Sequence, residues 1–365
     1  MPKTLYQKII DAHTVKAIDP NTVLLYCDIH FANEYTSPQA FAGLYERKLK
    51  VLSPDSQLCV VDHIIPTHDE SPRRIYDDAS LVQAQTLEKN CKHFGITAFY
   101  GADSAFQGIE HVVMQEQGLV RPGMVVICGD SHTTTHGAIG ALGFGIGTSE
   151  IEHILATQTL VYRLAGTMKI TINGHLQDGV SAKDLALAVL RKISARGALG
   201  LVVEYTGEAI DALSIEDRMT LCNLTVEAGA RGAMVAPDEK SLQWVFDHAK
   251  NLSESDREAM KRYCECLHSD PQAIFDKEAT LDATTVKPMV TWGTSPDQAI
   301  AFDEKIPEPD SFDDPIMKEA ACRALHYQVL KAGEPIYKTA IQHVFIGSCT
   351  NSRLCDLEAA AHVIK

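Results

Sequence analysis

Short apolar runs alternate with helical segments along the chain. Residues 23–27, 58–61 and 125–128 have the length and apolar character of buried strands. Residues 168–172 alternate apolar and polar side chains, whereas 181–193 show the spacing of an amphipathic helix, with Ser181 as its expected cap. This alternation predicts an α/β fold.

Changes in sequence character divide the chain into three predicted units. At 365 residues the chain exceeds the size of one ordinary hydrophobic core. We expect a first α/β domain over residues 1–166, a second α/β domain over 167–286, and a third α/β unit over 287–365. In the third unit, the acidic, proline-containing segment 304–315 is expected to be a connecting loop.

Composition and charge limit the classes of partner. The chain is 45% hydrophobic and 22% charged, which is normal for a soluble globular protein. Its formal net charge of −15 argues against nucleic acid or an anionic membrane as the main partner, but allows a small anionic substrate. The ten cysteines show no disulfide-type spacing, and no apolar leader or membrane-spanning stretch is evident. These features predict a cytoplasmic protein.

Three acidic residues follow three of the predicted strands. Asp28, Asp62 and Asp130 each end such a strand, and each has a histidine within two residues. Each could simply cap the following turn. In open α/β sheets, however, binding sites collect beyond the carboxyl ends of strands. We therefore expect the three acids to share one cleft.

The pair Asp62-His63 is a candidate acid–base group. An aspartate that orients an imidazole gives a general acid or base that can act near neutral pH. Adjacent residues of a strand point to opposite faces, so the pair can act together only if the strand has already ended.

A second candidate group lies in the run 129–137, which contains Asp130, Ser131 and His132. The glycines that follow, over residues 140–147, match neither a dinucleotide fingerprint nor a P-loop. We expect them to form a tightly packed turn beside a helix that begins near Ser149-Glu150. For Asp130, Ser131 and His132 we favour a functional role.

Glu227 and Cys349 complete the candidates. Glu227 lies on an apolar, helical stretch that ends at Gly229, where a carboxylate costs free energy unless it is paired or functional. Cys349 follows a predicted buried strand, 343–346, and precedes a predicted helix, 354–364. A strand-to-helix turn favours a thiolate, which could attack an electrophile or bind a metal; an inert buried thiol is the alternative.

These motifs resemble those of the aconitase superfamily, and within it the branch of isopropylmalate dehydratase large subunits of leucine biosynthesis. The resemblance covers nearly the whole chain and rests on residues 36–41, 62–63, 129–136, 145–153, 227–231, 290–296 and 347–351.

The resemblance implies a hydro-lyase of aconitase-like three-domain α/β/α fold that carries a 4Fe–4S cluster. The family holds the cluster with three cysteine thiolates and leaves one iron open as a Lewis acid. By motif, Cys349 corresponds to the first ligand, and His63, backed by Asp62, would protonate the departing hydroxyl. The other implied residues are those that order the cluster's surroundings, Asp130, His132, His111 and Glu227, and those that bind substrate or cluster, Gln39, Ser131 and Asn351.

The chain departs from the family pattern at the other ligands. The family's Cys-x-x-Cys motif is expected downstream of Cys349; Cys264-Glu265-Cys266 has the wrong spacing, and Cys355 follows too closely. We therefore expect a C-terminally truncated large subunit with an incomplete third domain, without a stable cluster and inactive as given. The family's serine base and a substrate-binding arginine come partly from a swivelling domain, which in this branch is a separate small subunit.

Three alternatives remain at this stage. Homoaconitase, or another hydroxy-acid hydratase of the same family, shares the motifs. A non-catalytic scaffold fragment would bind the small subunit without turnover. A zinc or manganese hydrolase could draw on a larger set of ligands, His30, His63, His132, His136, Asp28, Asp62 and Asp130.

Overall fold

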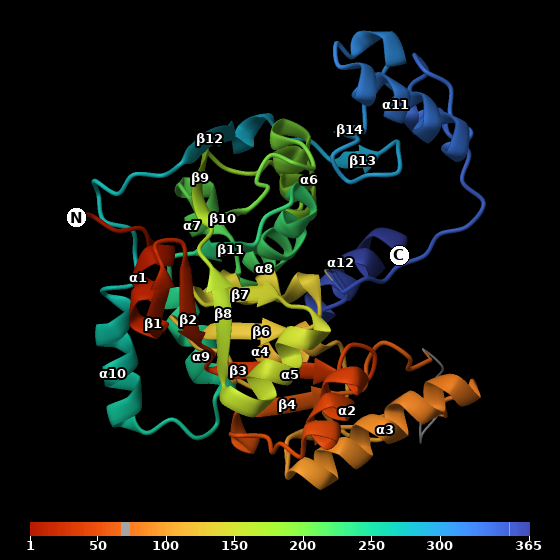
Figure 1. Ribbon diagram of the computed structural model, residues 1–365. Coiled ribbons are helices and arrows are strands. Elements are labelled where there is room, and N and C mark those ends of the chain that lie inside the picture. The colour runs from red at the N-terminus through yellow and green to blue at the C-terminus, as the bar shows by residue number, and fades with distance from the viewer. Residues whose placement is uncertain (67–73, 350) are drawn as a thin grey trace.

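The computed structural model describes residues 1–66, 74–349 and 351–365 (Figure 1). Thr350, part of the cysteine motif, lies outside the described residues. The structure confirms the α/β prediction, with helices packed around mainly parallel sheets. The division into units at residues 166 and 286 stays a prediction.

A five-stranded parallel sheet organises the first part of the chain, in the order β5-β4-β3-β6-β7. One face packs on α4 and on the 3₁₀ helix η2, and the other on α2, α3 and α5. Helices on both faces explain why its strands are almost uniformly apolar. The elements are β3 (Ile29–Asn33), β4 (Gln57–Val60), β5 (Phe99–Tyr100), β6 (Val125–Cys128), β7 (Leu142–Gly145), α2 (Pro38–Arg47), η1 (Pro54–Ser56), α3 (Asp78–Phe94), α4 (Glu110–Glu116), η2 (Ser131–Ile139) and α5 (Thr148–Thr157).

A small antiparallel sheet closes one side of this unit. Its order is β1-β2-β8, and the N-terminal helix α1 packs on it. The elements are α1 (Leu5–His13), β1 (Thr14–Asp19), β2 (Thr22–Tyr26) and β8 (Thr159–Arg163). The predicted strand 23–27 therefore exists, but it belongs to this sheet and not to the five-stranded one.

A second parallel sheet, in the order β11-β10-β9-β12, lies beside the first (Figure 1). Its helix α6 begins as predicted: the Ser181 hydroxyl accepts from the Asp184 N–H, and the Asp184 carboxylate accepts from Ser181 in return. The elements are β9 (Gly166–Asn173), α6 (Ala182–Ile193), β10 (Leu201–Thr206), α7 (Glu208–Ala212), α8 (Ile215–Leu224), η3 (Thr225–Ala228), β11 (Gly232–Val235), α9 (Glu239–His248), α10 (Glu254–Cys264), β12 (Lys277–Asp282) and η4 (Ala283–Thr285).

The two parallel sheets meet where η2 packs on β11 and α8. Gly137 of η2 lies directly against the second sheet, so that a Cβ at this position would fall 1.7 Å from the carbonyl oxygen of Ala233. Only glycine permits this approach. The position of η2 is therefore fixed by both sheets at once.

The last part of the chain has a small core of its own around Trp292, Ile300 and Leu325. From there an extended segment returns to the main body, where α12 packs (Figure 1). The elements are β13 (Met289–Thr291), β14 (Ala299–Ala301), η5 (Pro309–Ser311), α11 (Pro315–Gln328), η6 (Ile336–Lys338) and α12 (Leu354–Ile364).

The structure confirms the predicted helix 354–364 as α12, but contradicts the buried strand predicted for 343–346. That segment is irregular, and Val344 and Phe345 are 79% and 88% exposed. A strand needs a neighbouring strand to satisfy its backbone, and none pairs with this segment among the described residues. Within the same residues, no helix combines the length and the apolar character needed to span a bilayer.

Arg218 of α8 gives a test of this packing. Its side chain is fully buried, with Nη2 2.6 Å from Asp238 Oδ2 and Nε 3.3 Å from the carbonyl oxygen of Ile210. We expect Arg218→Ala to lower the free energy of unfolding by about 3 kcal/mol, because loss of this fully buried side chain leaves a cavity and breaks its hydrogen bonds to Ile210 and Asp238. Arg191→Ala, at an exposed ion pair with Glu304, should cost less than about 1 kcal/mol. Urea unfolding measures both, and equal losses would contradict the expectation.

Candidate active site

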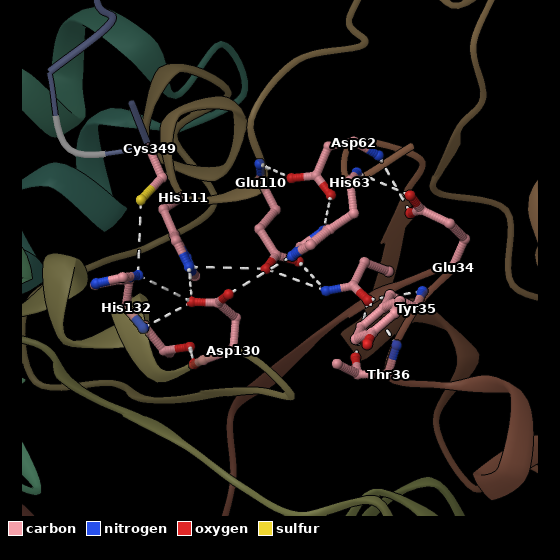
Figure 2. Close-up of polar contacts among 12 residues, drawn as sticks. Glu34, Tyr35, Thr36, Asp62, His63, Glu110, His111, Asp130, His132 and Cys349 are labelled. Carbon is pink, nitrogen blue, oxygen red and sulfur yellow. Dashed lines mark hydrogen bonds and ion pairs between the residues drawn. The ribbon is translucent and has the colours of Figure 1, made fainter. Parts of the chain in front are cut away.

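The carboxyl ends of β4, β3 and β6 lie side by side at one edge of the five-stranded sheet. The chain that follows β4 carries Asp62 and His63, and the chain that follows β6 carries Asp130 (Figure 2). The structure thus brings two of the three acids together, as predicted. Asp28 is the exception: it precedes β3, at the opposite edge, where its Oδ2 accepts from the Val125 N–H at 2.7 Å and lies 2.9 Å from His13 Nε2.

Asp62 and His63 form a hydrogen-bonded pair. Because β4 ends at Val60, the two adjacent side chains can turn toward each other, and His63 Nδ1 lies 2.6 Å from Asp62 Oδ1. The imidazole is partly exposed, and its Nε2 lies 3.7 Å from Asp130 Oδ2. Hydrogen bonding with Asp130 and with Asp62 raises the pKa of His63 to about 11. His63 is therefore an imidazolium at neutral pH, held at Nδ1 by Asp62 and with Nε2 facing Asp130.

Asp130 is the central carboxylate of the site. Its Oδ1 accepts from the backbone N–H of His132 at 2.7 Å, which starts η2, and lies 3.0 Å from Nε2 of the buried His111. Burial alone would raise the pKa of Asp130, but the hydrogen bonds from His111 and His63 outweigh it and hold that pKa well below its ordinary range. The same contacts raise the pKa of His111 despite its burial.

His132 connects Asp130 to the two remaining candidates. Its Nδ1 lies 3.6 Å from Cys349 Sγ, and its Nε2 lies 3.4 Å from Glu227 Oε1. The contact with the Cys349 thiol raises the pKa of His132 to about 9. Glu227 lies on η3, which ends at Gly229 with a positive φ, as the sequence predicted. An imidazolium beside a partly exposed cysteine favours the thiolate form of that cysteine.

The turn that carries Cys349 is fixed to α8. Asn351 Nδ2 donates to Thr220 Oγ1 at 3.0 Å, and the Asn351 backbone N–H donates to Ser348 Oγ at 2.9 Å. Asn351 thus contacts the scaffold as well as its own turn. Its predicted role in binding substrate or cluster stays a prediction.

Gln39 and Ser131 are both exposed, and Ser131 directly follows Asp130. Gln39 lies on the first turn of α2. Ser131 opens η2 and lines a cleft of about 380 Å³ together with Gly145 and Arg231. The glycines of this region pack as predicted: a Cβ on Gly143 would fall 2.2 Å from the carbonyl oxygen of Thr133.

Two buried carboxylates near the site, Glu34 and Glu110, were not among the candidates predicted from the sequence. Glu34 is fully buried, and its carboxylate accepts the backbone N–H groups of Asp62, His63 and Ile64 at 3.2, 2.8 and 3.0 Å (Figure 2). It follows β3 just as Asp62 follows β4, so a strand prediction over residues 29–33 would have found it. Glu110 opens α4, and the only sequence signal for it is its place beside His111.

His30 and His136 lie in the core, and the ring of His136 packs edge-on against that of His111, with the ring centroids 5.5 Å apart. His30 Nδ1 lies 2.8 Å from Gln57 Oε1, and His136 Nδ1 lies 3.0 Å from Gln115 Nε2. Burial lowers the pKa of both, so they are neutral structural residues. Asp62, His63, Asp130 and His132 of the hydrolase ligand set do lie together, so that alternative stays a prediction.

The cysteines allow a test of whether an iron–sulfur cluster fits this chain. Cys349 is a partly exposed thiol beside His132, as a cluster ligand would require. Cys59 and Cys128 lie beneath the site but are fully buried. A hydrogen bond with Cys91 together with burial raises the pKa of Cys59, and burial raises that of Cys128, so both stay protonated. Of these three cysteines, Cys349 alone combines exposure with a neighbouring imidazolium, as a cluster ligand would require.

Two comparisons show which known proteins the sequence of this chain resembles. The family described as "Aconitase family (aconitate hydratase)" matches residues 7–365. Two proteins, both named "3-isopropylmalate dehydratase large subunit 2", one from Salmonella typhimurium and one from Salmonella choleraesuis, are each 48% identical over 365 residues. These alignments cover all of this chain and 77% of each relative.

Replacement of Glu34 tests the geometry of the Asp62-His63 turn. We expect Glu34→Ala to lower the free energy of unfolding by about 2–3 kcal/mol, because three partly buried N–H groups lose their acceptor. Hydrogen exchange at the amides of residues 62–64 should accelerate at the same time. Glu46→Ala, at an exposed position of α2, serves as the control and should change neither measurement. Unchanged exchange at residues 62–64 in Glu34→Ala would contradict the assignment.

Proposed function

The chain belongs to the aconitase family, and on that basis we propose that it is the large subunit of a 3-isopropylmalate dehydratase, a hydro-lyase that interconverts 2-isopropylmalate and 3-isopropylmalate by dehydration and rehydration. The observation that carries this proposal is the Asp62–His63–Asp130 group, in which an oriented and partly exposed imidazolium stands beside an ionised carboxylate. The 48% identity to two proteins of that name supports the choice of substrate.

We propose His63 as the general acid. Asp62 holds Nδ1, and Nε2, which lies 3.7 Å from Asp130 Oδ2, would donate its proton to the departing hydroxyl group of the substrate. Hydroxide is a far stronger base than the neutral imidazole, so an acid with a pKa of about 11 can still protonate it as it leaves. In the rehydration direction the neutral imidazole takes the proton back from water. His63 Nε2 thus donates the proton in the dehydration step and accepts it again in the rehydration step.

The other site residues would order the groups around this acid. Asp130 and His111 fix the position of His63, and Glu227 with His132 faces Cys349. When bound, the family's 4Fe–4S cluster supplies Lewis acidity toward the substrate hydroxyl and carboxylate. Cys349 is the residue of this chain that would hold it. Gln39, Ser131 and Asn351 would contact the substrate or its surroundings.

A small subunit is the proposed partner. The relatives are named "large subunit". The described part of this site contains acids, imidazoles and a thiol, but no arginine or lysine is paired with Asp62, Asp130 or Glu227 there. A dicarboxylate substrate needs cationic groups. We propose that the partner contributes cationic groups in addition to the imidazolium ions of this chain, together with the base that removes the substrate proton.

Substitution of the acid pair tests this function in the assembled enzyme. We expect His63→Gln to lower kcat by about 10²–10⁴-fold, because proton transfer to the leaving group is lost. Asp62→Asn should move the alkaline limb of the activity profile to lower pH, since loss of the carboxylate lowers the pKa of His63. His153→Gln, on the exposed face of α5, is the control and should retain activity. Full activity in His63→Gln would exclude His63 as the acid.

A further inference from the structure

Glu110 occupies a position beneath the proposed acid that the mechanism above does not use. Its side chain is 1% exposed, and both carboxylate oxygens lie 3.2 Å from Asn33 Nδ2. Its backbone N–H donates to Asp62 Oδ2 at 2.7 Å, on the side of that carboxylate away from His63 (Figure 2). The same residue therefore fixes Asp62 and places a second carboxyl group under the site.

Glu110 is also close to the other charged groups. One nitrogen of His63 and one oxygen each of Glu110 and Asp130 lie within 4.8 Å of one another. His111 Nε2 lies 3.7 Å from Glu110 Oε1. The titratable groups that face Glu110 come from two further elements and from its own helix. They are Asp62, His63 and Cys59 from β4 and the chain after it, Cys128 and Asp130 from β6 and the chain after it, and His111 from α4.

The charges in this group do not balance when every acid is ionised. Asp62, Asp130 and Glu110 would carry three negative charges against the two imidazolium ions of His63 and His111. Glu110 is the most deeply buried of the three acids, so the surplus charge is most costly there. Burial accordingly raises the pKa of Glu110 to about 7. Glu110 therefore gains and loses its proton in the neutral range.

We propose that Glu110 is a positioning residue of the acid site, which fixes Asp62 through its backbone and sets, by gaining or losing one proton, how firmly His63 and His111 hold theirs. Below neutrality Glu110 is neutral, and the cluster contains two carboxylates and two imidazolium ions. Above neutrality its negative charge adds to the attraction on both imidazolium ions, so His63 keeps its proton to higher pH. This inference rests on the proposed function only where it names His63 as the acid.

The first test follows the histidine rings by NMR in the full chain. In the wild-type protein, ring nitrogen signals of His63 and His111 should shift near pH 7, as the neighbouring carboxyl group ionises. Glu110→Gln should abolish this inflection, and the final deprotonation of His63 should move down by about one pH unit. Glu110→Asp, which keeps the charge, should restore an inflection. Glu116→Gln, which removes one exposed charge from the same helix, should leave it in place.

The second test is the pH dependence of stability, which needs no assignment of signals. Because the pKa of Glu110 is higher in the folded than in the unfolded chain, the folded state binds more protons between about pH 4.5 and 7, and stability falls as pH rises through that window. The melting temperature of the wild-type protein should therefore drop relative to that of Glu110→Gln between pH 5 and pH 7.5. Parallel curves for the two proteins would overturn the inference.

The two tests are independent of catalytic turnover. If the assembled enzyme lacks hydro-lyase activity while the neutral-pH inflection is present and depends on Glu110, the proposed function fails and the role of Glu110 stands. If activity is present but the inflection persists in Glu110→Gln, the proposed role of Glu110 fails and the function stands.

Discussion

The site depends on one electrostatic constraint. Several carboxylates meet at one edge of the five-stranded sheet, and each needs cationic groups or N–H donors close to it. Asp130 is neutralised by two imidazolium ions and a backbone N–H. Glu34 is held instead by the three N–H groups of the Asp62 turn. Because a buried carboxylate without such partners is very costly, these contacts define the positions of the chain segments that follow β3, β4 and β6. The arrangement of the acids is thus also the main determinant of the local backbone.

The fold could be predicted from the sequence wherever local signals agree with tertiary packing. The helix that begins after Ser181 and the strand β6 were predicted correctly, since apolar spacing and capping both mark them. The segment 343–346 is apolar enough for a strand but is exposed and unpaired, because strand formation depends on a neighbour that local sequence does not specify. Strand membership shows the same limit: the run at 23–27 forms a strand, but in a different sheet.

The candidate site shows a similar division. Asp62, His63 and Asp130 stand out because they follow apolar strands, and the structure brings them together. Asp28 has the same local pattern but lies at the opposite edge of the five-stranded sheet. It precedes β3 of that sheet, whereas Asp62 and Asp130 follow β4 and β6. Sequence patterns do not identify Glu110, because its proposed role depends on charged residues that come close to it only in the folded chain. The contact between His132 and Cys349 joins residues 217 positions apart, which motif recognition can suggest but only the fold can place.

The close contact at Gly137 has a consequence for how this protein can vary. Gly137 lies on η2, whose first residues include Ser131 and His132, and it touches the backbone of the second sheet at Ala233. Any side chain at this position would push η2 away from the second sheet, and that sheet's helices carry Glu227 and Thr220. The gap between the two halves of the site is therefore set by the absence of a single methyl group. Substitutions at residue 137 would resemble active-site defects, although the residue touches none of the proposed chemistry.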